Sequence, residues 1–262
     1  MRSIAVMNQK GGVGKTTTAV NLCAALAENG NRTCLLDIDP QAHASLHLGL
    51  EAGPDRPSVY ELLTNRAHLA DVRCQVAENL WLVPSSIDLA AVEFEMSSMT
   101  DRQTLLRDKL RDDPLEIDYL VIDCPPSLGT LTLNALVAVE EILIPLQPHF
   151  LALHGLSRLL ETIEVVAGRI NSRLRLGGVV FCMYDSGTRL ASEVSGDVEQ
   201  FFANARGQST PWSSAVAFQT RIRRNIRLAE APSFGQSIFQ YAPASNGAAD
   251  YRSLAEEIAA GR

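Results

Sequence analysis

A glycine-rich segment near the N-terminus combines the residue types that bind nucleotide phosphates. It lies between the apolar run Ile4–Met7 and a helical pattern. Glycines let the backbone turn its N–H groups toward a phosphate, and the start of the next helix adds the positive end of its dipole. We expect Lys15 to reach the β- and γ-phosphates and Thr16 to place its hydroxyl on Mg²⁺. The predicted nucleotide-binding residues are Lys10, Gly11, Gly12, Val13, Gly14, Lys15, Thr16 and Thr17.

Lys10 is a second lysine, at the entrance of this loop. The strict pattern G-x-x-x-x-G-K-[ST] is not met, because Gln9 stands where its first glycine belongs. Lys15 already neutralises the phosphates within its own subunit. Lys10 could therefore point away from them and reach the nucleotide of a facing subunit, as an arginine finger does in trans. The alternative is a solvated lysine without a catalytic role.

Two aspartates end the next apolar run, Thr33–Ile38, and Pro40 would stop a strand there. Asp37 and Asp39 are two residues apart, so in extended chain they face the same side. At the carboxyl end of a strand beside the phosphate loop, that side is the nucleotide site. We expect Asp39 to orient the attacking water and Asp37 to support Mg²⁺ through water. The alternative for each is a strand-end aspartate that caps the following turn.

A third aspartate, Asp123, follows the apolar run Tyr119–Ile122. An apolar strand that ends in aspartate next to a phosphate loop is the arrangement that holds Mg²⁺ in many nucleotide hydrolases. Asp123 is therefore the predicted metal ligand, together with Thr16 and Asp37. We interpret the neighbouring Cys124 as a buried, inert cysteine, because no set of cysteines with cluster-ligand spacing accompanies it.

Positive charge is concentrated in the C-terminal third of the chain. The segment 169–227 holds nine arginines, no lysine and four acidic residues, whereas the whole chain has a formal net charge of −7. Such asymmetry is typical of a surface for a polyanion such as a nucleic acid. Alternatives are a solvated arginine-rich surface, or contacts to the ATP base or a partner protein. The candidate DNA-binding residues are Arg189, Arg221, Arg223, Arg224 and Arg227.

Short apolar runs alternate with helical patterns along the chain, which is the signature of βαβ units and a parallel sheet. We predict an α/β fold with a doubly wound, mostly parallel sheet flanked by helices, in a single domain spanning 1–262. Helices are expected from Ala19 to Gly30, from a capping box at Thr100, from Leu153 to Gly168 and from Ala248 to Ala260. The expected strands are Ile4–Met7, Thr33–Ile38, Leu80–Val83, Tyr119–Ile122, Ile142–Leu146, Val179–Met183 and Val216–Ile222.

The composition excludes several classes of protein. The chain has 262 residues, of which 46% are hydrophobic and 20% charged, as in ordinary globular proteins. No apolar run approaches the roughly 18 residues of a membrane span. The five cysteines form no Cys-x-x-Cys pair, which argues against a zinc ribbon, a thioredoxin motif or a disulfide framework. We therefore expect a reduced, cytoplasmic protein that does not enter a membrane.

The segment K-G-G-V-G-K-T-T resembles the deviant Walker A loop of the ParA/MinD ATPases. Asp37-Ile38-Asp39-Pro40-Gln41 and the segment from Asp123 to Leu136 are similar to the switch segments of ParA proteins, although Ala42 and His43 depart from the family pattern. The stretch from Asn225 to Gly235 is similar to the short, chromosomal Soj type. The resemblance extends from Ile4 to Ile258, and no helix-turn-helix segment precedes the loop, so we expect no sequence-specific operator binding.

This resemblance implies a P-loop ATPase that uses ATP and Mg²⁺, with Lys10, Lys15 and Asp39 as its catalytic residues. It further implies an ATP-dependent homodimer in which Lys10 crosses to the partner's nucleotide. The dimer would bind double-stranded DNA without sequence preference through the C-terminal arginines, associate with the nucleoid and respond to a ParB-like activator. Asn225 would lie beside the adenine, although Arg223 stands where the family has proline. The function implied is segregation of chromosome or plasmid DNA, or positioning of a cargo.

Three rival functions use the same type of loop. A MinD-like membrane-positioning ATPase needs a basic amphipathic tail, whereas the last helix carries Glu256 and Glu257 on its polar face. A metabolic or redox enzyme needs substrate or cluster ligands, which the sequence does not show. A tyrosine kinase of this class has a tyrosine-rich tail, and the last fifty residues hold only Tyr241 and Tyr251. The partition ATPase remains the leading interpretation.

Overall fold

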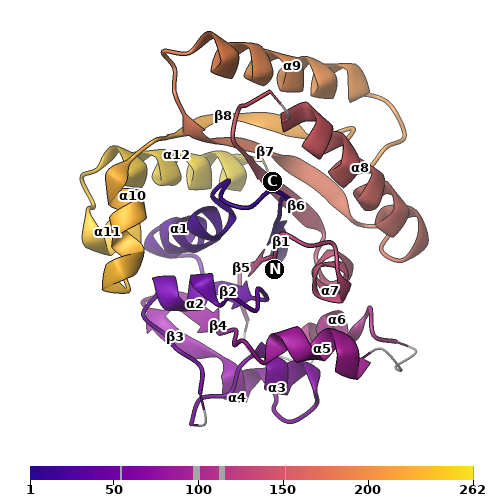
Figure 1. The fold of residues 1–262 in the computed structure, drawn as a ribbon, viewed down its shortest axis with the longest axis vertical. Helices are drawn as coiled ribbons and strands as arrows, with labels where there is room; N and C mark the ends of the chain where they lie inside the picture. The colour runs from indigo at the N-terminus through magenta and orange to yellow at the C-terminus, as the bar shows by residue number, and fades with distance from the viewer. Residues whose placement is uncertain (54, 97–100, 112–115, 151, 262) are drawn as a thin grey trace.

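The computed structural model describes residues 1–53, 55–96, 101–111, 116–150 and 152–261. A twisted sheet of eight strands runs through the molecule (Figure 1). Its strand order is β3-β4-β2-β5-β1-β6-β7-β8, and β3 alone pairs in the antiparallel sense. The strands are β1 (Arg2–Val6), β2 (Thr33–Asp37), β3 (Cys74–Ala77), β4 (Leu80–Val83), β5 (Tyr119–Asp123), β6 (Glu141–Leu146), β7 (Arg175–Tyr184) and β8 (Val216–Arg223).

Helices cover both faces of this sheet, so the predicted doubly wound α/β fold is confirmed (Figure 1). The longer helices are α1 (Lys15–Glu28), α7 (Thr130–Ala138), α8 (Ala152–Arg169), α9 (Arg189–Ala205) and α12 (Asn246–Ala260). The shorter ones are α2 (His43–His47), α3 (Val59–Leu63), α4 (Leu69–Val72), α5 (Leu89–Glu95), α6 (Leu105–Arg111), α10 (Ile226–Glu230), the 3-10 helix η2 (Ala231–Phe234) and α11 (Ile238–Tyr241).

Each central strand contributes to two separate cores, because successive side chains point to opposite faces of a sheet. In β1, Ile4 and Val6 pack with α1, α11 and α12. Ala5 and Met7 pack with the opposite core, which α3 and α5 to α9 complete. A strand that is buried on both faces needs apolar side chains on both, so its sequence is a continuous apolar run and not an alternating pattern.

The strand order gathers the predicted site residues at one edge. Strand β5 lies between β1 and β2, and all three are parallel. Val6 is in register with Asp123 on one side, and Asp37 is in register with Asp123 on the other. The phosphate loop, which follows β1, and the two aspartate segments therefore emerge together at the carboxyl ends of adjacent strands, where ligands of open α/β sheets bind.

The seven strands predicted from apolar runs are all present, with ends shifted by a few residues. Strand β3 was not predicted, because its side chains are at best half-buried at the sheet edge and no apolar run marks it. Helix α9 was also missed, although Thr188 caps its N-terminus. Gly30 adopts a φ of +82° beyond the end of α1, as its predicted role requires. The capping box proposed at Thr100 lies outside the described residues.

The packing of β7 against β8 yields a first prediction. A Cβ atom on Gly178 would lie 2.6 Å from the Val216 carbonyl oxygen and 2.7 Å from the Phe218 ring. We expect Gly178→Ala to lower the free energy of unfolding by about 1–3 kcal/mol, since backbone must shift to accept the methyl group. Urea denaturation followed by circular dichroism measures the change.

Gly196→Ala in α9 is the matched control for this substitution. A Cβ there meets no atom within 4 Å, so the new methyl group is accepted without strain. Alanine is also the better helix former, by roughly 1 kcal/mol. Gly196→Ala should therefore leave the stability unchanged or raise it. Equal stability of wild type and Gly178→Ala would show that β8 can move away from β7 at little cost.

Candidate nucleotide site

The phosphate loop folds as its glycines predict. Gly12 and Gly14 have φ angles of +72° and +95°, in the left-handed region that favours glycine. Gly14 is the N-cap of α1 and carries no side chain that could bond the first N–H groups of the helix. A Cβ on Gly11 or Gly12 would meet no atom within 4 Å, so the loop faces open space. This geometry fits a bound phosphate group.

Lys15 lies over the loop that carries it. It is only 8% exposed, and its Nζ donates a hydrogen bond of 3.2 Å to the carbonyl oxygen of Lys10. Burial lowers the pKa of Lys15, and the carboxylates of Asp123 and Asp39 oppose that shift. The ammonium group is thus held between the loop and the acidic ends of β2 and β5, as a phosphate-binding lysine would be.

Asp123 is fully buried at the end of β5, and within the described part of the chain neither of its carboxylate oxygens has a hydrogen-bond partner. Burial raises the pKa of Asp123 well above its usual range, and nearby Asp37 adds to the shift. The Thr16 hydroxyl and the Lys15 charge oppose it. Buried carboxylate oxygens without partners, facing a threonine hydroxyl, match the hard oxygen ligands that Mg²⁺ prefers.

No group of three or more His, Cys, Asp or Glu side chains that could hold a metal is found among the residues that the structure describes. Magnesium at nucleotide sites does not need such a group, because one or two carboxylates and the substrate phosphates complete its coordination with water. Thr16 and Asp123 therefore fit a magnesium ion that binds together with a nucleotide. When bound, the ion would neutralise charge on the phosphate oxygens.

Asp37 anchors the segment that follows β2, which we call the switch loop (residues 38–45). Its Oδ1 accepts a bond from the backbone N–H of Asp39, at 3.1 Å. Its Oδ2 accepts bonds from the backbone N–H of Ser45, at 2.9 Å, and from the Ser45 hydroxyl, at 2.7 Å. Burial raises the pKa of Asp37 to about 6, and the bonds from Ser45 and Asp39 limit the shift. The predicted support of Mg²⁺ by Asp37 stays a prediction.

Ser45 is a site residue that the sequence-based reasoning did not assign. Besides its two bonds to Asp37, its hydroxyl accepts a bond of 3.0 Å from the backbone N–H of Ser85, at the end of β4. Asp39, 8% exposed, accepts a bond from the Gln41 N–H at 3.0 Å, which shapes the turn after it. Ser45 thus fixes both ends of the switch loop. The signal was present in the sequence, because the family pattern has serine or threonine at this position.

Lys10 is exposed at the entrance of the loop. Its backbone N–H donates to Asn8 Oδ1 at 3.0 Å, and Asn8 Nδ2 in turn donates to the carbonyl oxygen of Pro145 at 2.8 Å. The backbone of the entrance is therefore tied to β6 while the lysine side chain remains available to other molecules. Its proposed role at a facing subunit stays a prediction.

Four of the five candidate DNA-binding arginines form ion pairs within the chain, and Arg224 has none among the described residues. Arg221 is the least accessible: its side chain is 19% exposed, pairs with Glu199 at 2.7 Å and lies over the rings of Phe181 and Tyr184. The remaining pairs are Arg189 with Glu193, Arg223 with Asp250 and Arg227 with Glu230.

The carboxylates in these pairs neutralise part of the positive charge for which the sequence analysis expected a polyanionic ligand. Arg223 donates to both carboxylate oxygens of Asp250, through its backbone N–H and through its guanidinium, with Nη2 to Oδ1 at 2.6 Å. Asn225 caps α10, since its Oδ1 accepts the Arg227 N–H at 2.8 Å. Its predicted place beside adenine is not tested by this contact and stays a prediction.

The fold and the loop geometry define a P-loop nucleotide-binding protein. The family model described as an AAA domain matches residues 1–176. The chain is 43% identical to the sporulation initiation inhibitor protein Soj of Bacillus subtilis over 258 residues, covering 98% of each chain. It is also 43% identical to the chromosome-partitioning ATPase Soj of Treponema pallidum, covering 99% of this chain and 97% of the relative.

A solved structure shares the fold over its whole length. Cobyrinic acid a,c-diamide synthase from Mycobacterium smegmatis, with a bound ATP analogue and magnesium, is 34% identical with a TM-score of 0.80, covering 98% of this chain and 93% of the other. The chain belongs to the Soj/ParA family of chromosome-partitioning ATPases. It is accordingly an ATPase whose cofactors are ATP and Mg²⁺.

The buried carboxylate of Asp123, which has no hydrogen-bond partner among the described residues, should destabilise the folded protein when no nucleotide is bound. We expect Asp123→Asn to raise the free energy of unfolding of the nucleotide-free protein by about 1–2 kcal/mol and to abolish ATP turnover. Since burial raises the pKa of Asp123, folding retains a proton that the unfolded chain releases. The wild type therefore loses stability as pH rises above the ordinary aspartate range. The variant loses less, because only Asp37 then keeps a raised pKa.

Urea denaturation at pH 5 and pH 8, without nucleotide or magnesium, measures this difference, which should be larger at the higher pH. A steady-state assay of ATP hydrolysis measures the loss of turnover. A variant that is less stable than the wild type at pH 8 would mean that the Asp123 charge is compensated in the folded protein.

Ser45 should act as a positioning residue for Asp39. We expect Ser45→Ala to lower kcat for ATP hydrolysis roughly 10- to 100-fold, because the switch loop loses the hydroxyl that joins Asp37 to Ser85. Nucleotide affinity, measured by calorimetry, should change little. Ser45→Thr keeps the hydroxyl and should restore turnover. Loss of affinity and turnover together in Ser45→Ala would indicate general damage to the site.

Proposed function

We propose that the protein is an ATP-dependent dimerising switch that binds double-stranded DNA without sequence preference. ATP hydrolysis then releases the DNA, and repeated cycles segregate chromosome or plasmid DNA or position a cargo on the nucleoid. The observation that carries the proposal is the pairing of a complete phosphate site around Lys15 with a second, exposed lysine at the loop entrance, Lys10. One lysine serves the nucleotide of its own subunit, and the other is free for that of a second subunit.

The nucleotide cycle uses the residues at the ends of β1, β2 and β5. Lys15 binds the β- and γ-phosphates, and Thr16 with Asp123 holds the metal. Asp39 orients the attacking water, and Lys10 of the facing subunit stabilises charge on the transferred phosphate. ATP then favours the dimer because only the dimer provides both lysines, so the nucleotide has different contacts in the two states. A ParB-like partner accelerates hydrolysis and returns the protein to the monomer.

The DNA contacts come from the accessible arginines of α9, of α10 and of the turn between β8 and α10. Arg224 is exposed and has no ion pair among the described residues. Arg189 and Arg227 each form an exposed ion pair with a glutamate one turn further along the same helix. Exposed helix pairs of this kind contribute about 0.3–0.5 kcal/mol, so a DNA phosphate can replace the carboxylate at little cost. Arg221, with its guanidinium packed on Phe181, instead shapes the surface that presents the others.

The last helix does not favour the MinD-like alternative. No helix in the described ranges is long and apolar enough to cross a membrane. The apolar side chains of α12 are buried in the core against α1 and β8, and they are therefore not free to insert into a lipid surface. They are Tyr251, Leu254, Ala255 and Ile258.

Binding to an unrelated DNA duplex, measured by fluorescence anisotropy with ATP, with ADP and without nucleotide, tests this function. We expect tight binding with ATP only. If the two surfaces of a dimer contact roughly six phosphates, the slope of log affinity against log salt should be about −5. The double variant Arg224→Ala/Arg227→Ala should lose most of the affinity and flatten the slope.

Two controls make the result specific. Arg158→Ala removes an exposed arginine of α8 and should leave DNA binding unchanged. Lys10→Ala should keep nucleotide binding but prevent ATP-dependent dimerisation in analytical ultracentrifugation. Absence of DNA binding by the wild type in every nucleotide state would refute the proposed DNA switch and leave the four paired arginines with a role in internal ion pairing.

A further inference from the structure

In the part of the chain that the structure describes, strand β8 forms one edge of the sheet, and it leads directly to Arg224 and α10. An edge strand has a strand partner on one side only, so its remaining backbone N–H groups need other acceptors. Helix α12 lies along β8 (Figure 1) and supplies two carboxylates that accept such groups, Asp250 and Glu257. The C-terminal helix therefore holds the strand that leads to the proposed DNA surface.

Strand β8 is irregular at the place where Glu257 binds it. From Val179 to Phe181, β7 advances by two residues, whereas the residues of β8 that pair with them, Ala217 and Arg221, are four apart. Two residues of β8 are therefore extra, and we call residues 218–220 the β8 bulge. A bulge bends its strand and redirects the side chains that follow it.

Glu257 binds the backbone of the β8 bulge with both carboxylate oxygens. Its Oε1 accepts the N–H of Gln219 at 2.6 Å, and its Oε2 accepts the N–H of Thr220 at 3.0 Å. Consecutive N–H groups of a regular strand point to opposite sides, so both reach one carboxylate because the chain bulges there. Hydrogen bonds to an ionised acceptor are also stronger than neutral ones. Glu257 thus stabilises the bulged form of the strand.

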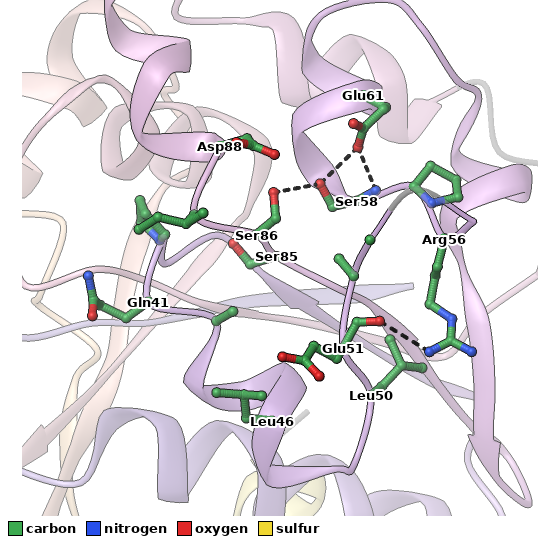
Figure 2. A pocket seen from close by; sticks show the side chains of 16 residues that line it. Gln41, Leu46, Leu50, Glu51, Arg56, Ser58, Glu61, Ser85, Ser86 and Asp88 are labelled. Carbon is green, nitrogen blue, oxygen red and sulfur yellow. Dashed lines mark hydrogen bonds between the residues drawn. The ribbon is translucent and has the colours of Figure 1, made fainter.

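This contact differs from the bond by which a carboxylate caps its own helix. Glu61 accepts the backbone N–H of Ser58, three residues earlier, at the start of α3 (Figure 2). Such a bond stabilises the helix that contains both residues. Glu257 lies 38 residues from Gln219 in the chain, so its bonds fix one element relative to another.

Two further contacts hold β8 around and beyond the bulge. The Arg221 guanidinium donates back to the carbonyl oxygen of Phe218, at the start of the bulge. Asp250, also on α12, accepts the backbone N–H of Arg223 at 3.0 Å. The backbone is therefore held from the bulge to the residue that directly precedes Arg224.

Arg224 depends on this backbone more than the other candidate arginines do. It is exposed, and within the described part of the chain no ion pair holds its side chain. Arg221, Arg223 and Arg227 each have a carboxylate partner that fixes the guanidinium. The direction in which Arg224 leaves the protein is consequently set by the strand that precedes it.

We propose that Glu257 is a positioning residue for DNA binding, which holds the β8 bulge and thereby directs Arg224 toward the phosphate backbone. The inference rests on the proposed function, because it concerns the same DNA surface. The expected effect has the opposite sign to that of charge. A carboxylate repels DNA, so on charge alone its removal tightens binding, whereas removal of a positioning residue weakens binding.

The variants Glu257→Gln and Glu256→Gln test this assignment, since each removes one negative charge from the same turn of α12. Glu256 is exposed and serves as the matched control. A glutamine at 257 has one acceptor oxygen on its side chain and cannot keep both bonds in the present geometry. In ATP-dependent binding to a DNA duplex, measured by fluorescence anisotropy, Glu257→Gln should lower the affinity about fivefold. Glu256→Gln should bind as tightly as the wild type or slightly tighter.

The dependence of binding on salt separates positioning from a loss of folded protein. Each lost phosphate contact reduces the slope of log affinity against log salt by roughly one. Loss of the Arg224 contact from both subunits of a dimer should therefore flatten the slope by about two. A smaller folded fraction lowers the apparent affinity and leaves the slope unchanged. Weaker binding by Glu257→Gln at the wild-type slope would thus contradict the positioning role.

Combination with Arg224→Ala is an independent check. If Glu257 acts through Arg224, then Glu257→Gln should change the affinity by less than about twofold in the Arg224→Ala background. Additive losses from the two substitutions would refute the proposal. Binding by Glu257→Gln as tight as that of Glu256→Gln would refute it too, because charge alone would then account for both variants.

Hydrogen exchange in the free protein tests the contact without DNA. The N–H groups of Gln219 and Thr220 should exchange about tenfold faster in Glu257→Gln than in the wild type, and at the wild-type rate in Glu256→Gln. Unchanged exchange in Glu257→Gln would show that the carboxylate does not hold the bulge. Absence of DNA binding by the wild type refutes the proposed function itself, whereas equal DNA binding by the wild type and Glu257→Gln refutes the positioning role alone.

Discussion

Negative charge buried at the carboxyl edge of the sheet is the constraint on which the site depends. Asp37 and Asp123 face each other across adjacent strands, both fully buried, with Lys15 as the nearby cation. Burial raises the pKa of both carboxyls, so the site favours any ligand that brings positive charge to Asp123. Magnesium bound with a nucleotide is such a ligand, so the electrostatics of this edge of the sheet match the chemistry of the ATPase.

Asp37 and Asp123 are paired across neighbouring strands but have different hydrogen-bond partners. Asp37 uses both oxygens to hold the switch loop, whereas Asp123 has no hydrogen-bond partner among the described residues. One carboxylate therefore fixes the loop and the other is left for a ligand. Helix α2, which begins within this loop, packs against η2 in the C-terminal region. Changes at the switch loop are thus close to the segment that carries Arg227.

Much of this site could be predicted from the sequence, because it depends on local patterns. The glycine spacing around Lys15 predicts a phosphate loop between a strand and a helix. The apolar runs that end in Asp37 and Asp123 predict strands whose carboxyl ends lie beside this loop. The structure brings the loop and the two aspartates together at that edge of the sheet. The role of Ser45 and its contact with Ser85 could not be predicted in the same way. They depend on how residues 40–60 fold against the end of β4, where the chain has no strong periodicity and short helices are set by tertiary contacts.

The arginine-rich segment shows the limit of counting charges along a chain. Its excess of nine arginines over four acids gave no information on ion pairs with residues outside it, such as Asp250 and Glu230. Pairing inside the protein lowers the potential that DNA would meet, and it makes Arg224 the strongest candidate for a phosphate contact. Under the proposed function, such a surface would bind DNA weakly as a single copy, because few of its charges are unpaired. Two copies side by side would double the contacts, so ATP-dependent dimerisation would be sufficient to control DNA binding.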